Sequence, residues 1–199
     1  MIASKRKSLQ RQLLYFPIVH DQFDMGTLGE SVKQATIKKL GRTGWKQMVS
    51  KVDRLWDDIE KKINKLSVPF DTVRIYQDGL PVSSRELDIV NELAYSGSRN
   101  YKLLYDMVNK GVMLMGTEDS ELLLEEYDSA KSQFGSGKLL PKNNLQLFES
   151  SKLLEKRDKF IAQRINDTLC LGETGVIFIG ALHNIKPWIA QDVTITYAI

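Results

Sequence analysis

The sequence has few of the residues that build preformed metal and redox sites. Its 199 residues include one cysteine, Cys170, and two histidines. A single cysteine excludes an internal disulfide and any metal site made of several cysteines. It also indicates a reducing compartment, so we expect a cytoplasmic protein. Because Cys170 falls within a predicted helix, we expect a packed, unreactive thiol.

Long apolar runs and a dominant charge are also missing. No stretch approaches the roughly 20 apolar residues that a membrane span needs, and the run 13–19 lacks the small residues of a signal-peptide cleavage site. The 28 basic and 25 acidic residues are interleaved and leave a net charge of +3, which argues against nucleic-acid binding. We therefore expect no membrane span and no nucleic-acid partner, but a small-molecule or peptide substrate. Association into a homo-oligomer stays open.

Proline is sparse, and the prolines and glycines separate strand-like from helix-like segments. Short apolar runs predict five strands, at residues 13–20, 72–78, 112–117, 175–183 and 193–198. Apolar residues three and four apart predict the intervening helices, most clearly over 45–66 and over 145–171. This alternation predicts one α/β domain over 1–199, with a mostly parallel central sheet of about five strands flanked by helices.

Two features of the first part of the chain modify this prediction. The helical residues between the first two strands exceed one crossover, so we expect a helical insertion, a flap over about 28–67, after the first strand. Pro17 lies within the first strand, and proline cannot donate to a ladder of hydrogen bonds. We therefore expect a sheet edge or a bulge at that position.

Each strand of the predicted parallel set is followed by titratable or polar side chains. They are His20, Asp24, Asp78, Glu118, His183 and Asn184. Ligands of open α/β sheets bind outside the carboxyl ends of the strands. We therefore expect these residues to face one polar cleft, with the imidazoles of His20 and His183 within roughly 10 Å of each other.

Imidazole is both a common metal ligand and the commonest general base near neutral pH. Two histidines with carboxylates would suit a divalent metal ion that activates water. The predicted metal ligands are His20, His183, Asp24 and Asp78, and the predicted catalytic residues are His20, His183, Glu118 and Arg157. The alternatives are structural histidines and, for Asp78, a turn residue of an Asp-Gly pair. Asp119 is better explained as a helix cap.

Arg157 and Arg164 border the apolar stripe of the helix predicted over 145–171. They could lie along its flank with extended side chains, or reach the cleft to bind an anionic group or order a carboxylate. An unpaired charge beside Leu153 and Phe160 would be costly. We therefore expect Arg157 to bond a strand-end carboxylate, Asp78 or Glu118, or to point into the cleft. Arg164 and Asn184 are the predicted substrate-binding residues.

Three stretches occur in the order of a known pattern: Phe16-Pro-Ile-Val-His20, Arg157-Asp158 and Gly180-Ala-Leu-His183. They resemble the superfamily that contains TraB/PrgY, the Tiki proteases, erythromycin esterases and ChaN-like haem-uptake proteins. Its members typically have a histidine after the first strand, an Arg-Asn/Asp pair opening a helix, and a strand ending Gly-x-x-His. The first stretch departs from this pattern, because it lacks the glutamate that usually lies near that histidine. Asp24 or Glu118 would have to take its place.

The resemblance implies a hydrolase, dependent on a divalent metal ion, similar to the small prokaryotic members of this group, which imply no substrate. The superfamily also includes haem-binding proteins, so a non-catalytic protein that binds haem or another cofactor is an alternative. A further alternative is an interaction module that uses the flap residues 45–66 as its partner surface.

Overall fold

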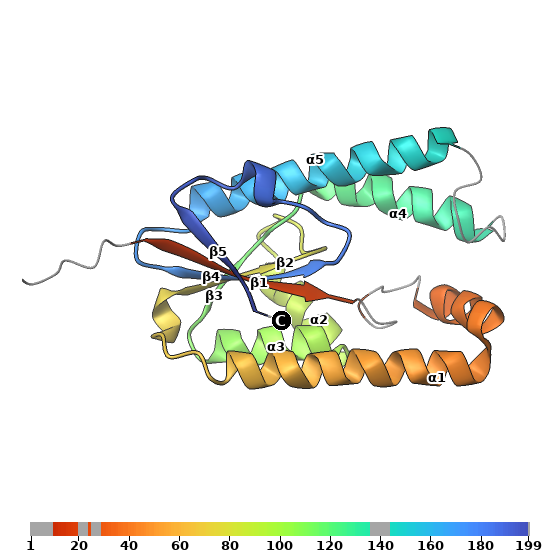
Figure 1. Ribbon diagram of the computed structural model, residues 1–199, viewed down its shortest axis with the longest axis horizontal. Coiled ribbons are helices and arrows are strands. Elements are labelled where there is room, and N and C mark those ends of the chain that lie inside the picture. Colours follow the sequence, from red (N-terminus) through yellow and green to blue (C-terminus); the bar gives the residue numbers. More distant parts are fainter. Residues whose placement is uncertain (1–9, 20–23, 25–28, 136–143, 199) are drawn as a thin grey trace, which may run out of the picture.

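The central sheet has five strands, and each pair of neighbours is parallel (Figure 1). The structure is a computed structural model that describes residues 10–19, 24, 29–135 and 144–198. The strands are β1 (Arg11–Ile18), β2 (Val73–Gln77), β3 (Met113–Met115), β4 (Thr174–Gly180) and β5 (Val193–Tyr197). Their order in the sheet is β3-β2-β4-β1-β5. The predicted α/β fold with a parallel sheet is confirmed.

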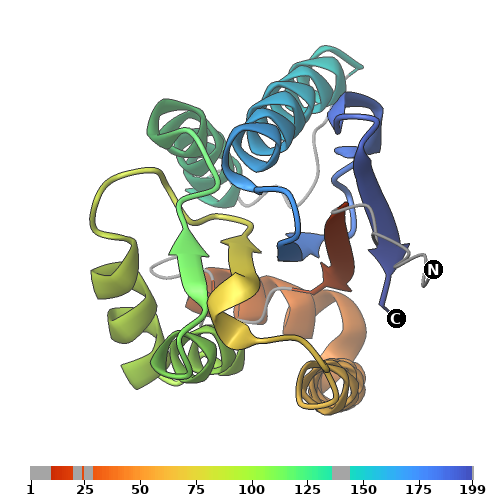
Figure 2. The same ribbon diagram turned by 90° about the vertical axis from the view of Figure 1, so that its left-hand side faces the viewer.

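Helices cover both faces of the sheet (Figure 2). On one face lie α1 (Gly29–Ile63) and α3 (Arg99–Asn109), with α2 (Glu86–Tyr95) packed beside α3. On the other face lies α5 (Asn144–Thr168), with α4 (Ser120–Gly135) beside it. Two short 3₁₀ turns, η2 (Phe70–Thr72) and η3 (Lys186–Trp188), precede β2 and β5. Within the described ranges, no helix is long and apolar enough to cross a membrane.

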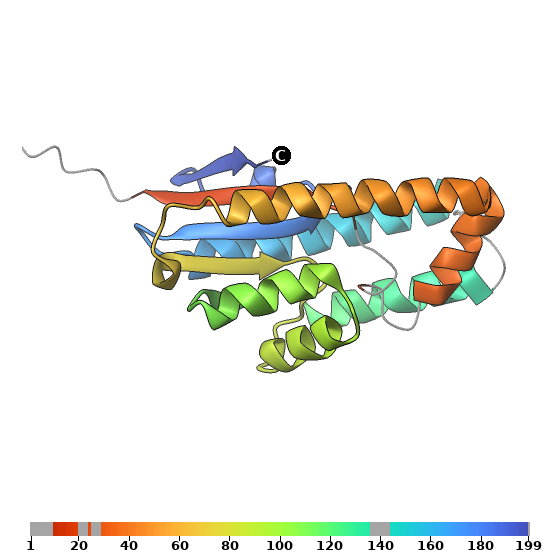
Figure 3. The ribbon, with the colours of Figure 1, turned by 90° about the horizontal axis from the view of Figure 1, so that it is seen from below.

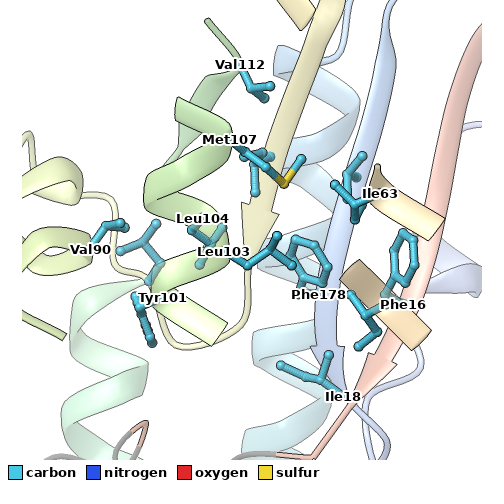
Figure 4. Close-up of a cluster of buried hydrophobic side chains, with 14 of the residues drawn as sticks. Phe16, Ile18, Ile63, Val90, Tyr101, Leu103, Leu104, Met107, Val112 and Phe178 are labelled. Atoms are coloured by element: carbon cyan, nitrogen blue, oxygen red, sulfur yellow. The ribbon is translucent and has the colours of Figure 1, made fainter. Parts of the chain in front are cut away.

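The continuous apolar run of β4 explains its central position. Val176 and Phe178 pack toward α1 and α3, whereas Ile177 and Ile179 pack toward α5. Strands that are buried on both faces read as unbroken apolar runs, because successive side chains point to opposite layers. Figure 4 shows the first of these two layers, with Phe16 and Phe178 beside each other on neighbouring strands.

The predicted helical insertion after β1 is α1, and its two parts lie in different places. Gly41, at φ +72°, interrupts the helix with a kink that a residue with a Cβ adopts only with strain. The part before the kink lies beyond the carboxyl ends of the strands (Figures 1 and 3). The part after it is a layer of the core, because Trp56, Ile59 and Ile63 are buried against the sheet. The predicted flap over about 28–67 therefore fits only the part of α1 before Gly41.

Two local expectations differ from the structure. Pro17 lies in an interior strand, between β4 and β5, rather than in an edge strand or at a bulge. Pairing of β1 with β5 ends at Tyr15, however, so Pro17 lies where β1 pairs with β4 alone. Cys170 lies beyond the end of α5 at Thr168 rather than within the helix. The residue is exposed, so the prediction of a packed thiol is wrong.

The sheet order creates a topological switch point between β2 and β4. From β2 the chain continues through α2 and α3 to β3, whereas from β4 it continues through η3 to β5 on the other side. Connections that leave neighbouring strands in opposite directions open a crevice at their carboxyl ends, and this crevice is where such folds bind ligands.

The core assignment of β4 gives a stability prediction. Ile179→Ala should lower the free energy of unfolding by about 2–5 kcal/mol, because it leaves a cavity at a fully buried position. Leu171→Ala is the matched control; its side chain is 65% exposed, so the change should stay within about 0.5 kcal/mol. Urea unfolding measures both, and equal effects would contradict the assignment.

Candidate active site

The Asp78 carboxylate lies across the switch point, between the ends of β2 and β4. The backbone N–H of Asp78 donates to the carbonyl of Phe178 at 2.9 Å, and the N–H of Gly180 donates to Asp78 Oδ2 at 2.8 Å. Asp78 also precedes a turn, since Gly79 has a φ of +77°. Both interpretations of this Asp-Gly pair therefore hold, because the backbone turns here while the carboxylate points into the crevice.

Glu118 is delivered to the same place by the segment that follows β3. Its backbone pairs with Pro81, and its Oε1 accepts the N–H of Gly79 at 2.8 Å. The side chain is completely buried. The next residue, Asp119, accepts the N–H groups of Glu121 and Leu122 at the start of α4, which confirms its predicted role as a helix cap.

Arg157, on α5, bridges the two carboxylates. Its Nε donates to Glu118 Oε2 at 2.6 Å, and its Nη2 donates to Glu118 Oε1 at 2.6 Å and to Asp78 Oδ1 at 2.8 Å. Nη1 donates to Glu126 on α4. Burial disfavours the charged guanidinium, but the bonds to Glu118 and the charge of Asp78 raise the pKa of Arg157. The predicted pairing of Arg157 with strand-end carboxylates is confirmed.

His183 lies between two further carboxylates. Its Nδ1 lies 2.5 Å from Asp158 Oδ1, and its Nε2 lies 3.4 Å from Asp78 Oδ2. Asp158 Oδ2 also accepts the backbone N–H of Asn184 at 3.0 Å. Burial lowers the pKa of His183, but the hydrogen bonds with Asp158 and Asp78 outweigh it and raise the pKa to about 9.

Asp158 belongs to the site, although sequence reasoning placed it in a motif without assigning it a role. It follows Arg157 directly, and neighbouring residues of a helix project about 100° apart. One turn of α5 therefore serves two parts of the site, with Arg157 holding the acid pair and Asp158 holding the imidazole. The Arg-Asp pair and the Gly-x-x-His stretch were the available signals, and their contact could not be read from spacing.

Asp78, Glu118 and His183 form a group that could hold a metal ion. Each offers one ligand atom, and these atoms lie within 4.8 Å of one another. Burial raises the pKa of Glu118 to about 7, although the hydrogen bonds from Arg157 oppose this. Asp78 and His183 were predicted as metal ligands, whereas Glu118 was predicted as a catalytic residue.

A pocket of about 610 Å³ opens over the carboxyl ends of the strands and is lined by two members of this group, Asp78 and His183, but not by Glu118. Asp78, Arg157 and His183 line it, together with Tyr101 at the start of α3. The Tyr101 ring points in the direction in which the strands end (Figure 4). Burial raises the pKa of Tyr101, so its hydroxyl stays protonated at neutral pH. Sequence reasoning assigned no role to Tyr101, because nothing in its local pattern separates it from core aromatics.

The remaining predicted site residues are placed less centrally or fall outside the described residues. His20 lies outside them, so its predicted approach to His183 stays a prediction. Asp24 lines the pocket and accepts a hydrogen bond from Ser98, but in the part of the chain described here it is not in the three-residue group. Arg164 donates to the carbonyl of Gly116 at 3.2 Å, and Asn184 is exposed and contributes its backbone N–H. Neither is among the residues that line this pocket.

Comparison of the chain with protein-family models, with curated proteins and with solved structures finds no match in any of the three. The resemblance to the TraB and Tiki group therefore rests on the three short stretches alone. What the site does has to be argued from its geometry.

The role of Arg157 gives a prediction about stability. Arg157→Leu should lower the free energy of unfolding by about 3–5 kcal/mol, because it leaves two buried carboxylates without their counter-charge. Arg157→Lys should recover only part of this loss, since an ammonium group lacks the planar fork of donors. Urea unfolding measures these changes.

Two further variants test whether the lost stability comes from the buried ion pairs of Arg157. Arg164→Leu, on the same helix, removes one bond to a carbonyl and should cost about 1 kcal/mol. Adding Glu118→Gln to Arg157→Leu should restore part of the lost stability, because one buried charge is removed. Additive losses in the double variant would contradict the ion-pair interpretation.

Proposed function

We propose that this protein is a hydrolase that binds a divalent metal ion through Asp78, Glu118 and His183. The observation that carries the proposal is the convergence of three ligand atoms within 4.8 Å at the switch point, beneath an open pocket. Catalytic metal sites commonly use three protein ligands and leave a further position for water or substrate. The pocket gives that position access to a substrate.

The residues present fit a divalent ion in three respects. Two carboxylates and an imidazole are a donor set that zinc, manganese and iron accept. The contact with Asp158 fixes Nδ1 of His183 and leaves Nε2 on the side of Asp78, and metal-binding histidines are commonly oriented by a carboxylate in this way. Finally, with Glu118 ionised and His183 neutral, Asp78, Glu118 and Asp158 would carry two more negative charges than Arg157 neutralises, and a divalent cation would balance them.

The side chains around the ligands have separate tasks in this proposal. When bound, the ion supplies Lewis acidity, which lowers the pKa of water to about 7 and so provides a nucleophile near neutral pH. Arg157 holds the two carboxylates in place, and Asp158 sets the orientation of the imidazole. Tyr101 donates a hydrogen bond to the oxygen of the substrate carbonyl. His20 stays a predicted further ligand or general base.

Two alternative functions receive less support. Haem iron is usually held by histidine, cysteine, methionine or tyrosine, whereas two of the three ligand atoms in the group of described residues are carboxylate oxygens. An interaction surface on residues 45–66 would need an exposed apolar face. Trp56, Ile59 and Ile63 instead pack against the sheet, and Val49, at 37%, is the one exposed large apolar residue of this span.

The ligand set can be tested by metal binding. Protein stripped with a chelator and then loaded with zinc or manganese should retain one ion per chain, measured by elemental analysis and by titration calorimetry. Asp78→Asn, Glu118→Gln and His183→Gln should each weaken binding at least 10-fold, and Asp158→Asn should weaken it about 10–100-fold. Asp24→Asn is the matched control, because this carboxylate lines the same pocket outside the group.

The outcomes separate the alternatives. Unchanged binding by the Asp78 and Glu118 variants, or a loss confined to Asp24→Asn, would contradict the proposed ligands. A visible absorption band in the purified protein, lost in His183→Gln, would favour haem instead.

The raised pKa of His183 predicts proton release on metal binding. With a pKa of about 9 the imidazole is protonated at neutral pH, and it must lose its proton to bind an ion. About one proton per ion should therefore be released by His183 near pH 7.5, falling toward zero above about pH 9, while the affinity rises over that interval.

Titration calorimetry in buffers of different ionisation enthalpy measures this release. His183→Gln should release about one proton fewer than the unchanged protein at the same pH. Metal binding that is independent of pH between about 7 and 9 would show that His183 is not a ligand.

A further inference from the structure

We infer that this protein associates with a second copy of itself through two helices of opposite charge, with α1 of one copy lying against α4 of the other. The surfaces concerned are two exposed stripes of side chains, one basic and one acidic, on different helices of the same chain. The inference is independent of the proposed metal site, because it rests on residues that do not line the pocket.

Charge is unevenly distributed over the surface, although the chain as a whole is nearly balanced. Residues 31–52 of α1 contain no acidic side chain and six basic ones, which are Lys33, Lys38, Lys39, Arg42, Lys46 and Lys51. No residue of α1 between Glu30 and Leu55 is buried. We name residues 31–52 the basic arm. It lies on the surface, and all of its cations except Lys33 are exposed.

The basic arm carries a stripe of side chains at helical spacing. Arg42, Trp45, Lys46 and Val49 occupy positions i, i+3, i+4 and i+7, so they lie along one side of the helix. Arg42 and Lys46 are exposed, Val49 is 37% exposed, and Trp45 is half-buried. The stripe therefore combines two cations with apolar surface.

α4 presents an acidic stripe with the same spacing. Glu121, Leu124, Glu125 and Asp128 are all exposed, Leu124 by 62%. The opposite side of α4 lines the pocket, and Glu126 belongs to that side. A negative charge at Glu121 suits the amino end of a helix. Glu125 and Asp128 lie beyond the first turn, so the helix dipole does not account for them.

The two stripes match in spacing and in charge. Arg42 and Lys46 are four residues apart, and so are Glu121 and Glu125, which is about 6 Å along a helix axis. Two helices that lie side by side can therefore place a cation opposite each carboxylate, while Leu124 meets the apolar surface of the basic arm. Within the described part of the chain, none of these four charged side chains forms an ion pair.

The arrangement favours a second copy of the chain over a nucleic acid or a membrane. Figures 1 and 3 show that the basic arm and α4 both extend beyond the carboxyl ends of the strands, at the same end of the molecule. A polyanionic partner that approached the arm at this end would be repelled by the acidic stripe of α4. A second copy offers both charges, because the acidic stripe of each copy can meet the basic arm of the other.

This contact would also affect the pocket. Leu123 and Ala130 of α4 line it, and α4 packs beside α5. The basic arm of a second copy would hold α4 from its outer side, and so would fix one wall of the pocket.

Sedimentation velocity over a series of protein concentrations tests the association. At about 50 mM salt, the mean mass should rise from that of one chain toward that of two as the protein concentration increases to about 200 µM. Raising the salt concentration to about 500 mM should increase the dissociation constant at least about 10-fold, because salt screens exposed charges.

Charge reversal tests the two stripes. Arg42→Glu with Lys46→Glu, the arm-reversed protein, should have a dissociation constant at least about 10-fold higher, because attraction becomes repulsion. Glu121→Lys with Glu125→Lys, the α4-reversed protein, should be weakened equally. Combining the four changes in one chain should restore association, since the two stripes again carry opposite charges.

A mixture and a matched control make the test specific. The arm-reversed and α4-reversed proteins, one of them labelled at the exposed Cys170, should associate with each other although neither associates with itself. Each arm then meets an α4 of opposite charge. Lys62→Glu with Lys65→Glu changes the net charge as much as the arm-reversed protein does, at exposed residues outside the basic arm. It should leave the dissociation constant within about twofold.

The outcomes that contradict the inference are distinct. A mass of one chain at every concentration would overturn it, and so would an equally large effect of the control. Failure of both the four-change chain and the mixture to associate would exclude pairing of the arm with α4. Suppose that the unchanged protein stays monomeric and binds vesicles with about 30% phosphatidylserine, or a single-stranded RNA, and that the arm-reversed protein does not. The basic arm would then serve another partner, and the inference would be wrong.

Discussion

The bridge that Arg157 makes between Asp78 and Glu118 is the interaction on which the site depends. The two carboxylates arrive from different strand ends and are 4% and 0% exposed. Without a counter-charge, two neighbouring buried carboxylates would repel each other and lose their hydration. The guanidinium removes most of this cost with three charge-assisted bonds. It also fixes α5 against the ends of β2 and β3, and this places the next residue, Asp158, beside His183.

The same bridge gives the site two ways of balancing its charge. In the metal-free protein His183 is protonated and Glu118 titrates near neutral pH, so protons compensate the carboxylates. In the proposed metal-bound state, a divalent ion takes over this role and His183 becomes neutral. Protons and metal ions would then compete for one set of groups. Arg157 stays charged in both states, so the carboxylate geometry need not change between them.

The sequence predicted the layers of the fold better than the partners within the site. Unbroken apolar runs such as that of β4 indicate strands buried on both faces, and the apolar stripe of α5 indicated that Arg157 needs a partner. Strand order cannot be read from periodicity, because a strand's pattern tells which faces are buried and not which strand lies beside it. The contact of Asp78 with His183 follows from the adjacency of β2 and β4. Sequence spacing therefore favoured pairing His183 with His20, and it gave Asp158 and Tyr101 no role.

The Gly-x-x-His stretch after β4 now has a physical explanation in this chain. The N–H of Gly180 donates to Asp78, which fixes the end of β4 against the carboxylate. Three residues later, the N–H of His183 donates back to the carbonyl of Gly180 at 3.0 Å and closes a turn. The turn returns the chain to the crevice, so the side chain of His183 is 5% exposed while Ala181 and Leu182 remain in solvent. A spacing longer or shorter by one residue would break this closure and separate the imidazole from Asp78 and Asp158. The motif is therefore a requirement of the turn, and it places an acid-bound histidine and an exposed leucine at one pocket.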